Sequence, residues 1–424
     1  MTAAITLQGL KRRALSLGMV KTFDQAMQFL LPIVLVRCLD AATFGEYRLL
    51  WLIVGTLIGL ASLNMGGGLY FFLPRSDPAR KRLYIHHAWL YLAAVGALCA
   101  LIVSPLDPLL PEAARPLMKY GALLPAFIAV WFAALLLESL PTIDERIGWQ
   151  AAATLTVSVA RVALLALGAW LTGDMRVMLW LLVAAAALKL GLLVYYVRRH
   201  HGLGRPWLEP AAFAAQFRHS APFGFSAALY GLRGQADQWV AATLFSLHSF
   251  AAFSIAAILG QVVNLSRASV LEAFLPSMSR MHAAGENAGM MDMNSRANVL
   301  VAGLLYPLLA FVFVYADDVV RVVYTSTYLD AVPVMRVYAL DMATLAVEVG
   351  SLLLLLRQGP YAIGVNAVAL AFSAAASLAG ALYFGLPGAA AGSVLALLLD
   401  RALTLRRIAT TAGIPLAQVQ DWRG

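Results

Sequence analysis

Apolar runs of about twenty residues recur along the whole of this 424-residue chain, and they constrain its fold more than any other feature. A helix of roughly 20 residues crosses the ~30 Å hydrocarbon core of a bilayer. Hydrophobic residues make up 61% of the chain and charged residues only 12%, a balance that no single soluble core would need. The sequence therefore predicts an integral membrane protein.

About twelve of these runs are long enough to span a bilayer. They are continuously apolar, whereas the strands of a transmembrane barrel alternate with a two-residue period. We therefore expect an all-α membrane fold. The expected spans cover residues 16–37, 48–72, 85–104, 118–139, 152–172, 177–197, 219–245, 250–275, 297–315, 333–356, 361–384 and 388–405.

The basic residues between the spans predict the orientation, because Lys and Arg accumulate in short cytoplasmic loops. Every second connection is rich in them, so an even number of spans with both termini in the cytoplasm is expected. Most of the net charge of +9 is then explained by basic loops that set the orientation and attract anionic lipids. Binding of nucleic acid is not expected. The basic set is Lys11, Arg12, Arg13, Arg75, Arg80, Lys81, Arg82, Arg146, Arg198, Arg199, Arg205, Arg280, Arg357, Arg406 and Arg407.

A basic break at residues 198–218 divides the spans into six and six. We place an N-terminal lobe at residues 1–205 and a C-terminal lobe, preceded by a cytoplasmic linker, at residues 206–424. The first and seventh spans open alike, because a cation precedes an Asp-Gln pair by three or four residues in both. Both openings run outward, which predicts parallel repeats about an axis along the membrane normal.

Arg161 is the one charged residue in the apolar run 154–171. A guanidinium at mid-membrane depth costs about 3 kcal/mol on insertion scales, so it normally faces a protein interior or a wet cavity. Arg161 is therefore a candidate functional residue.

Four segments resemble the polysaccharide transporter family, the Wzx-type flippases of the multidrug/oligosaccharidyl-lipid/polysaccharide (MOP) exporter superfamily. Each motif is loose, but the four occur in the expected order and cover both lobes. They are RCLDAATFGEY at residues 37–47, FRHSAPF at 217–223 leading to DQW at 237–239, FLPSMSR at 274–280, and YTSTYLDAVPVMR at 324–336.

The resemblance implies a two-lobed, MATE-like fold in the cytoplasmic membrane of a bacterium. It implies a flippase that moves undecaprenyl diphosphate-linked oligosaccharide from the inner to the outer leaflet, by alternating access through a cationic central cavity. Membrane lipids and polysaccharide assembly proteins are the further partners considered, and we expect the chain to function as a monomer.

An anionic diphosphate and many hydroxyl groups need cationic, wet surroundings to pass hydrocarbon. The candidates for substrate binding are Arg161, Lys21, Arg233, Lys189 and Arg267. Arg suits phosphate best, because its fork makes paired hydrogen bonds.

Structural pairing is the competing interpretation for each of these cations. Lys21 and Asp24, and likewise Arg233 and Asp237, have spacings that allow pairing on one helix face. Asp24 is also the acid that would pair with Arg161 from another helix. Lys189 could extend toward the headgroups, and Arg267 could pair with Glu272 or reach the inner surface.

No phosphate-binding loop of the ATPase type is present, so transport would draw on a gradient or on consumption of the product. The acids at membrane depth, Asp24, Asp237, Asp341 and Glu348, are the candidates for proton coupling. Asn366 is available for a sodium site but no acid follows it on its helix, which argues against sodium. No cofactor or metal is expected.

Three other functions compete with the flippase. A MATE-like multidrug or cation antiporter shares the expected fold but would need an anionic, aromatic cavity. A membrane glycosyltransferase or polymerase would need a larger outer loop than the sequence offers. A scaffold for polysaccharide assembly is the third alternative.

Overall fold

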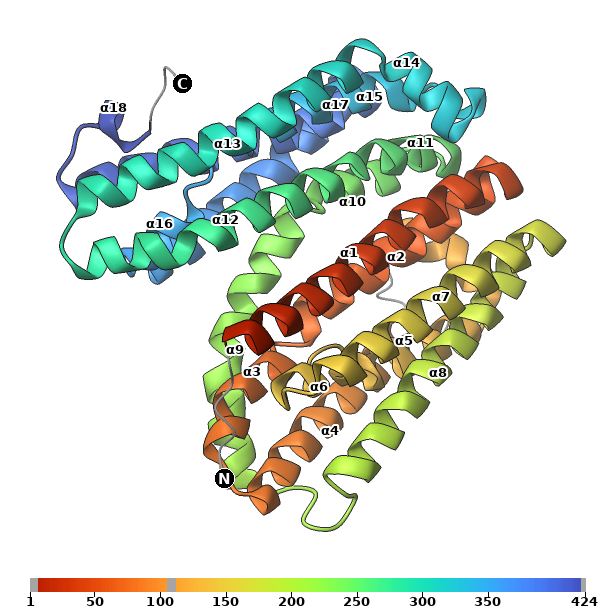
Figure 1. Cartoon of the computed structure of the whole chain (residues 1–424). Coiled ribbons are helices and arrows are strands. Elements are labelled where there is room, and N and C mark those ends of the chain that lie inside the picture. The colour runs from red at the N-terminus through yellow and green to blue at the C-terminus, as the bar shows by residue number, and fades with distance from the viewer. Residues whose placement is uncertain (1–6, 105–111, 421–424) are drawn as a thin grey trace. The chain divides into compact units, whose positions relative to one another are not determined.

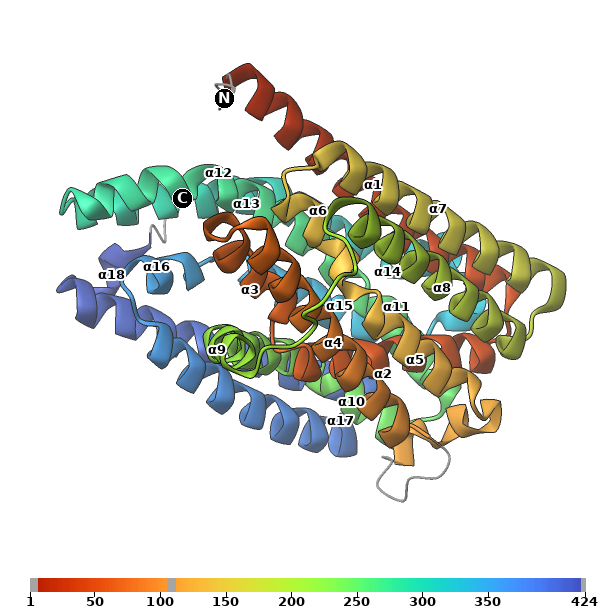
Figure 2. The same ribbon diagram turned by 90° about the horizontal axis from the view of Figure 1, so that it is seen from below.

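The computed structural model describes residues 7–104 and 112–420, and every regular element within them is helical (Figures 1 and 2). The chain forms two compact units, residues 1–228 and 229–424, which are described separately. Each unit is a bundle of apolar helices that bury aliphatic and aromatic side chains against one another.

The first unit pairs helices that are far apart in the sequence. Within it α1 packs on α7, α4 packs on α5, and α8 packs on both α5 and α7. Short 3₁₀ helices at Glu112–Tyr120 and Leu135–Glu138 flank α5. The helices are α1 (Leu7–Cys38), α2 (Ala41–Ala61), α3 (Met65–Phe72), α4 (Pro78–Ile102), α5 (Leu123–Ala133), α6 (Leu140–Ile143), α7 (Ile147–Thr172), α8 (Met175–His200) and most of α9 (Pro210–Arg233).

In the second unit, α10 packs along α17, α12 packs along α13, and α15 contacts α11, α13 and α17. Its longest helix, α17, bends at Gly385, whose φ of 66° lies in the left-handed region. The helices are α10 (Ala236–Leu244), α11 (Leu247–Ala257), α12 (Leu259–Ala283), α13 (Asn287–Val314), α14 (Ala316–Val319), α15 (Ala331–Thr344), α16 (Gly350–Leu355), α17 (Gly359–Ala412) and α18 (Leu416–Val419).

Each predicted span corresponds to helical structure, but several spans are broken. Among the described residues, seven helices are long and apolar enough to cross a membrane, and one pair bent by 98° would raise the number to eight. One of the seven is α17, which holds the last two predicted spans on either side of its bend. The remaining predicted spans are divided between successive shorter helices, so the all-helical fold is compatible with about twelve spans.

The break between α2 and α3 has a packing cause. Leu63 and Asn64 have φ values of 41° and 55°, which ends α2 and turns the chain into α3. The backbone of Leu63 lies so close to Gly224 of α9 that a Cβ at that glycine would be 2.3 Å from the Leu63 carbonyl carbon. The Tyr91 hydroxyl donates to the Ala61 carbonyl at the break, at 2.9 Å, so this carbonyl is hydrogen-bonded.

Aspartates begin three of the helices of the first unit. Asp40 accepts hydrogen bonds from the backbone of Ala42 and Thr43 at the start of α2, Asp77 caps α4, and Asp174 caps α8. The hydrogen bond from the Thr43 hydroxyl lowers the pKa of Asp40 against the opposing effect of burial. Such caps stabilise a helix start by about 1 kcal/mol each.

The cytoplasmic linker predicted between the lobes is fastened to the first unit. The His86 ring stacks on Trp207 at 4.2 Å between centroids, and the backbone N–H of Glu209 donates to His87 Nε2 at 3.0 Å. Gln216 of α9 donates to the Tyr84 carbonyl at 3.3 Å. These contacts place the linker and the start of α9 with residues 1–228, and the two compact units divide within α9.

A buried carboxylate joins the turn after α6 to the end of α8. Asp144 accepts hydrogen bonds from Tyr196 at 2.7 Å and pairs with His201 at 2.6 Å. Burial raises the pKa of Asp144, but the bonds from His201 and Tyr196 outweigh it, so the pKa lies below its ordinary value. The ionised carboxylate therefore stabilises the fold above the pKa of the unfolded chain, and this contribution is lost as the pH falls through the folded pKa.

Replacing Tyr196 with Phe should lower the unfolding free energy by about 1 kcal/mol, because it removes one donor from a buried carboxylate. Neighbouring Tyr195 is 59% exposed, so Tyr195→Phe is the matched control and should stay within about 0.5 kcal/mol of the parent. Thermal unfolding of the purified proteins in detergent measures both. Equal melting temperatures for the two variants would contradict the role assigned to Tyr196.

Candidate functional site

Arg161 lies on α7, and its guanidinium is held by aromatic rings. Its Cζ is 5.7 Å from the centroid of Trp51 on α2 and 5.9 Å from that of Trp131 on α5. No carboxylate among the described side chains lies within 4.0 Å of it. Its Nε is buried and donates to no hydrogen-bond acceptor in the described part of the chain. Arg161 is thus a cation at span depth whose charge is not neutralised by a direct ion pair.

Asp24 does not form the ion pair with Arg161 that the sequence left open. Ser158, one turn before Arg161 on α7, donates to one oxygen of Asp24, and Gln28 donates to the other at 2.9 Å. Both carboxylate oxygens therefore have a neutral donor. The side chain of Lys21 lies outside the described ones, so its pairing with Asp24 stays a prediction.

Lys189 on α8 is already paired. Its ammonium lies 2.5 Å from Glu138, and it also sits over the ring of Trp131 at 4.2 Å. The Lys189 side chain is 4% exposed, whereas that of Glu138 is 61% exposed. The lysine thus lies inside the bundle and pairs with a carboxylate that reaches the surface of the bundle.

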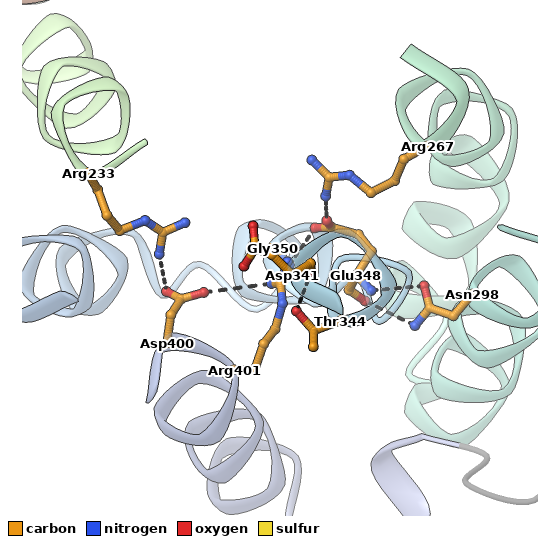
Figure 3. A network of polar contacts seen from close by, with 9 residues as sticks. All are labelled: Arg233, Arg267, Asn298, Asp341, Thr344, Glu348, Gly350, Asp400 and Arg401. Carbon is orange, nitrogen blue, oxygen red and sulfur yellow. Dashed lines mark hydrogen bonds and ion pairs between the residues drawn. The ribbon is translucent and has the colours of Figure 1, made fainter. Parts of the chain in front are cut away.

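In the second unit Arg233, at the end of α9, pairs with Asp400 of α17 at 2.9 Å (Figure 3). Asp400 is shared with its neighbour Arg401, whose guanidinium nitrogen lies 3.7 Å from the other carboxylate oxygen. The sequence suggested Asp237 as the partner of Arg233. The chain turns at residues 234–235 between α9 and α10, so the two residues are not on one helix face.

Arg267 of α12 pairs with Glu348, and several groups hold that carboxylate in place (Figure 3). Gly350 N–H donates to Glu348 Oε1 at 2.7 Å. Asn294 and Asn298 of α13 donate to the Glu348 carbonyl, and the Glu348 N–H donates back to Asn298 at 3.1 Å. These bonds fix the non-helical turn between α15 and α16, where an unpaired backbone would otherwise lie at membrane depth.

Asp237 and Asp341 are two further interior acids of the second unit. Tyr338 donates to Asp237 Oδ2 at 2.7 Å, and Oδ1 accepts the N–H of Gln238 at 2.8 Å. Asp341 follows Tyr338 by one turn of α15 and is 8% exposed, and its Oδ1 is buried with no hydrogen-bond partner among the described residues. No ion pair between described side chains includes Asp341.

Acids outnumber cations by one among the described interior charges of the second unit. In the second unit four interior acids, Asp237, Asp341, Glu348 and Asp400, face three guanidiniums, Arg233, Arg267 and Arg401. In the first unit Arg161 is a cation without a carboxylate partner. No described group of three or more His, Cys, Asp or Glu side chains is arranged to hold a metal ion.

Sequence reasoning missed five residues of these clusters. Trp51 and Trp131 resemble any other aromatic residue of an apolar span, and Glu138 lies at the edge of a predicted one. Asp400 and Arg401 carried a signal, because two adjacent charges inside the predicted span 388–405 are as costly as Arg161.

These features define a multi-pass membrane protein with ion pairs and single charges inside an apolar helical bundle. The chain belongs to the polysaccharide biosynthesis protein family, whose model matches residues 10–282. This family is part of the MOP superfamily of transporters and flippases. No curated protein sequence matches the chain.

Solved structures share the fold at low sequence identity. An inward-facing multidrug-resistance MATE transporter of the MOP superfamily is 13% identical, with a TM-score of 0.71 over 91% of this chain and 95% of that one. Lipid II flippase MurJ, inward closed, is 13% identical, with a TM-score of 0.67 over 95% and 88%. The bent form of the Vibrio cholerae MATE transporter VcmN is 14% identical, with a TM-score of 0.59 over 98% and 99%. The MATE-like fold predicted from the sequence is confirmed.

Replacing Arg267 with Met should destabilise the protein by about 3 kcal/mol, because Glu348 would be left buried without its counter-ion. A second change, Glu348→Gln, should recover most of that loss, since the amide keeps an oxygen for Gly350 and removes the charge. Unfolding of the single and double variants in detergent tests this. A double variant no more stable than Arg267→Met would contradict the ion-pair interpretation.

Proposed function

We propose that this protein is a flippase that moves undecaprenyl diphosphate-linked oligosaccharide from the inner to the outer leaflet of a bacterial cytoplasmic membrane, for assembly of a surface polysaccharide. Membership of the polysaccharide biosynthesis family supports the substrate class. The observation that carries the proposal is Arg161, a guanidinium at span depth held by indole rings and by no described carboxylate.

The diphosphate of an isoprenoid lipid would provide the negative counter-ion that Arg161 lacks among the described residues. The fork of a guanidinium makes two parallel hydrogen bonds to phosphate oxygens, and each charge-assisted bond is worth more than a neutral one. Lys189, Arg233 and Arg267 already have carboxylate partners, so they offer less to a new anion. Arg161 is therefore the primary phosphate contact in this proposal, and the other candidates have structural or secondary roles.

The direction of transport agrees with the membrane potential. With the cytoplasm negative, outward movement of one negative charge is favoured by about 2.3 kcal/mol per 100 mV, and entry of a proton is favoured equally. Proton entry requires a carboxyl group that can change its protonation state without breaking an ion pair. Asp341 is the best candidate, because Glu348 is paired with Arg267 and Asp237 already accepts two hydrogen bonds.

Both chain ends are proposed to lie in the cytoplasm, following the distribution of basic residues. A multidrug antiporter is the second candidate, favoured by the likeness to MATE transporters and by the surplus acid in the second unit. Organic cations would be attracted to Asp341 and repelled by Arg161. Export of a cationic dye that survives Arg161→Ala and is lost in Asp341→Asn would favour this antiporter over the flippase.

Replacing Arg161 with Ala should lower the rate of lipid-linked oligosaccharide flipping about tenfold to a hundredfold, because a desolvated diphosphate loses its charge-assisted hydrogen bonds. Arg161→Lys should keep part of the activity, since the charge remains but the fork is lost. Leaflet-specific labelling of the substrate in proteoliposomes measures the rate.

The control for this test is Arg296→Ala, because Arg296 is 75% exposed and its ion-pair partner among the described residues is Asp292, one turn away. Its flipping rate should match the parent, and size-exclusion chromatography of the purified variants checks that each is folded and not aggregated. A normal rate with Arg161→Ala would refute the proposed contact, and a normal rate without the protein would refute the flippase.

Replacing Asp341 with Asn should abolish the acceleration of flipping by an imposed proton gradient, because the amide keeps the shape of the side chain but cannot carry the proton. Asp292→Asn is the control, since Asp292 is an exposed acid of the same unit. Initial rates in proteoliposomes with and without the gradient give the comparison. Equal stimulation of both variants would remove Asp341 from the coupling mechanism.

A further inference from the structure

We infer that Trp51 and Trp131 are positioning residues for Arg161, which hold its guanidinium for the substrate diphosphate in place of a carboxylate. The inference rests on the proposed function, because it assigns a role to groups that touch Arg161 and not to groups that touch the lipid. It concerns residues of the first unit only.

The two indole rings form a rigid corner around the guanidinium. Their centroids are 5.5 Å apart with planes at 78°, so one ring meets the edge of the other. Phe127 packs against both, at 5.9 Å from Trp51 and 5.5 Å from Trp131, and Tyr47 meets Trp51 at 6.5 Å. Trp131 is 5% exposed. Aromatic pairs of this kind fix ring orientation, so Arg161 faces two surfaces that do not move independently.

Both rings attract the cation without cancelling its charge. A guanidinium within about 6 Å of a ring centroid is stabilised by the electron-rich face of the ring, most strongly by Trp. A carboxylate in the same position would neutralise Arg161 and would have to be displaced by each incoming phosphate. With indoles instead, the positive charge remains for an anion, and no counter-ion is exchanged during a transport cycle.

The nitrogen atoms of the Arg161 guanidinium differ in their exposure. Its Nε is enclosed and has no described partner, whereas the two Nη atoms are neither hydrogen-bonded to described residues nor fully buried. The end of the fork that makes paired contacts to phosphate is therefore accessible. The indoles contact the guanidinium and orient that end.

Substitution of Trp51 distinguishes the positioning role from ordinary packing better than substitution of Trp131 does. Trp131 also lies 4.2 Å from the Lys189 ammonium, so changes there act on two cations. Trp51 has Arg161 as its one described cation within range. A change confined to the electronic character of the Trp51 ring thus reports on Arg161 alone.

The experiment replaces Trp51 in the full-length protein with tryptophans carrying one to four fluorine atoms, which weaken the negative face of the ring while changing its size little. Binding of undecaprenyl diphosphate in detergent is measured, with undecaprenol as the uncharged comparison. The dissociation constant for the diphosphate should rise stepwise with fluorination, by about tenfold overall. Undecaprenol binding should not change, and a packing role alone would not produce a graded effect.

The same fluorination at Trp89 is the matched control, because this residue lies in the same unit and its Nε1 donates to the Ala133 carbonyl at 3.0 Å. It should leave diphosphate binding unaltered. In an Arg161→Gln background, fluorination at Trp51 should also have no further effect. If fluorination at Trp51 leaves the dissociation constant for the diphosphate unchanged while Arg161→Gln weakens diphosphate binding, the positioning role is refuted and the proposed flippase function is not. Unchanged diphosphate binding by Arg161→Gln overturns the phosphate contact on which the inference rests.

Discussion

The cost of placing a charge in hydrocarbon governs the interior of this protein. A buried ion loses several kcal/mol of hydration unless a partner replaces the water. Most interior charges have such partners, and the partners come from helices distant in the sequence: Glu138 for Lys189, Asp400 for Arg233, and Glu348 for Arg267. These pairs tie the helices of each bundle together. The interior charges without such a pair are therefore candidates for binding a substrate or a coupling ion.

Asp24 and Asp237 have neutral hydrogen-bond donors in place of a described ion pair. Arg161 and Asp341 have opposite sign, and neither side chain has an ion pair or hydrogen bond to a described residue. Arg161 in the first unit lies against indole rings, and Asp341 in the second lies beside acids and guanidiniums that are already engaged. A transporter that carries an anion one way and a proton the other needs one group of each sign whose occupancy can change. In the proposed mechanism the two units divide this work, with the anion contact in one and the protonation site in the other.

The sequence was sufficient for the fold because apolar length and charge distribution are local properties. It was sufficient for Arg161 because one guanidinium in an apolar run is visible without coordinates. It could not give the pairings, since i to i+4 spacing assumes a continuous helix, and the turn at residues 234–235 separates Arg233 from Asp237. The sequence could not show the aromatic rings around Arg161 either, because Trp51 and Trp131 contact Arg161 only through the packing of α2, α5 and α7.

The broken second span has a mechanical consequence. A continuous helix transmits twist and bending along its axis, whereas two left-handed residues at Leu63 and Asn64 interrupt the hydrogen-bond ladder that would transmit them. Because Gly224 presses on the Leu63 backbone, α9 is coupled to the chain at this joint. The joint therefore separates α2, whose Trp51 ring faces Arg161, from α3, which packs on α4.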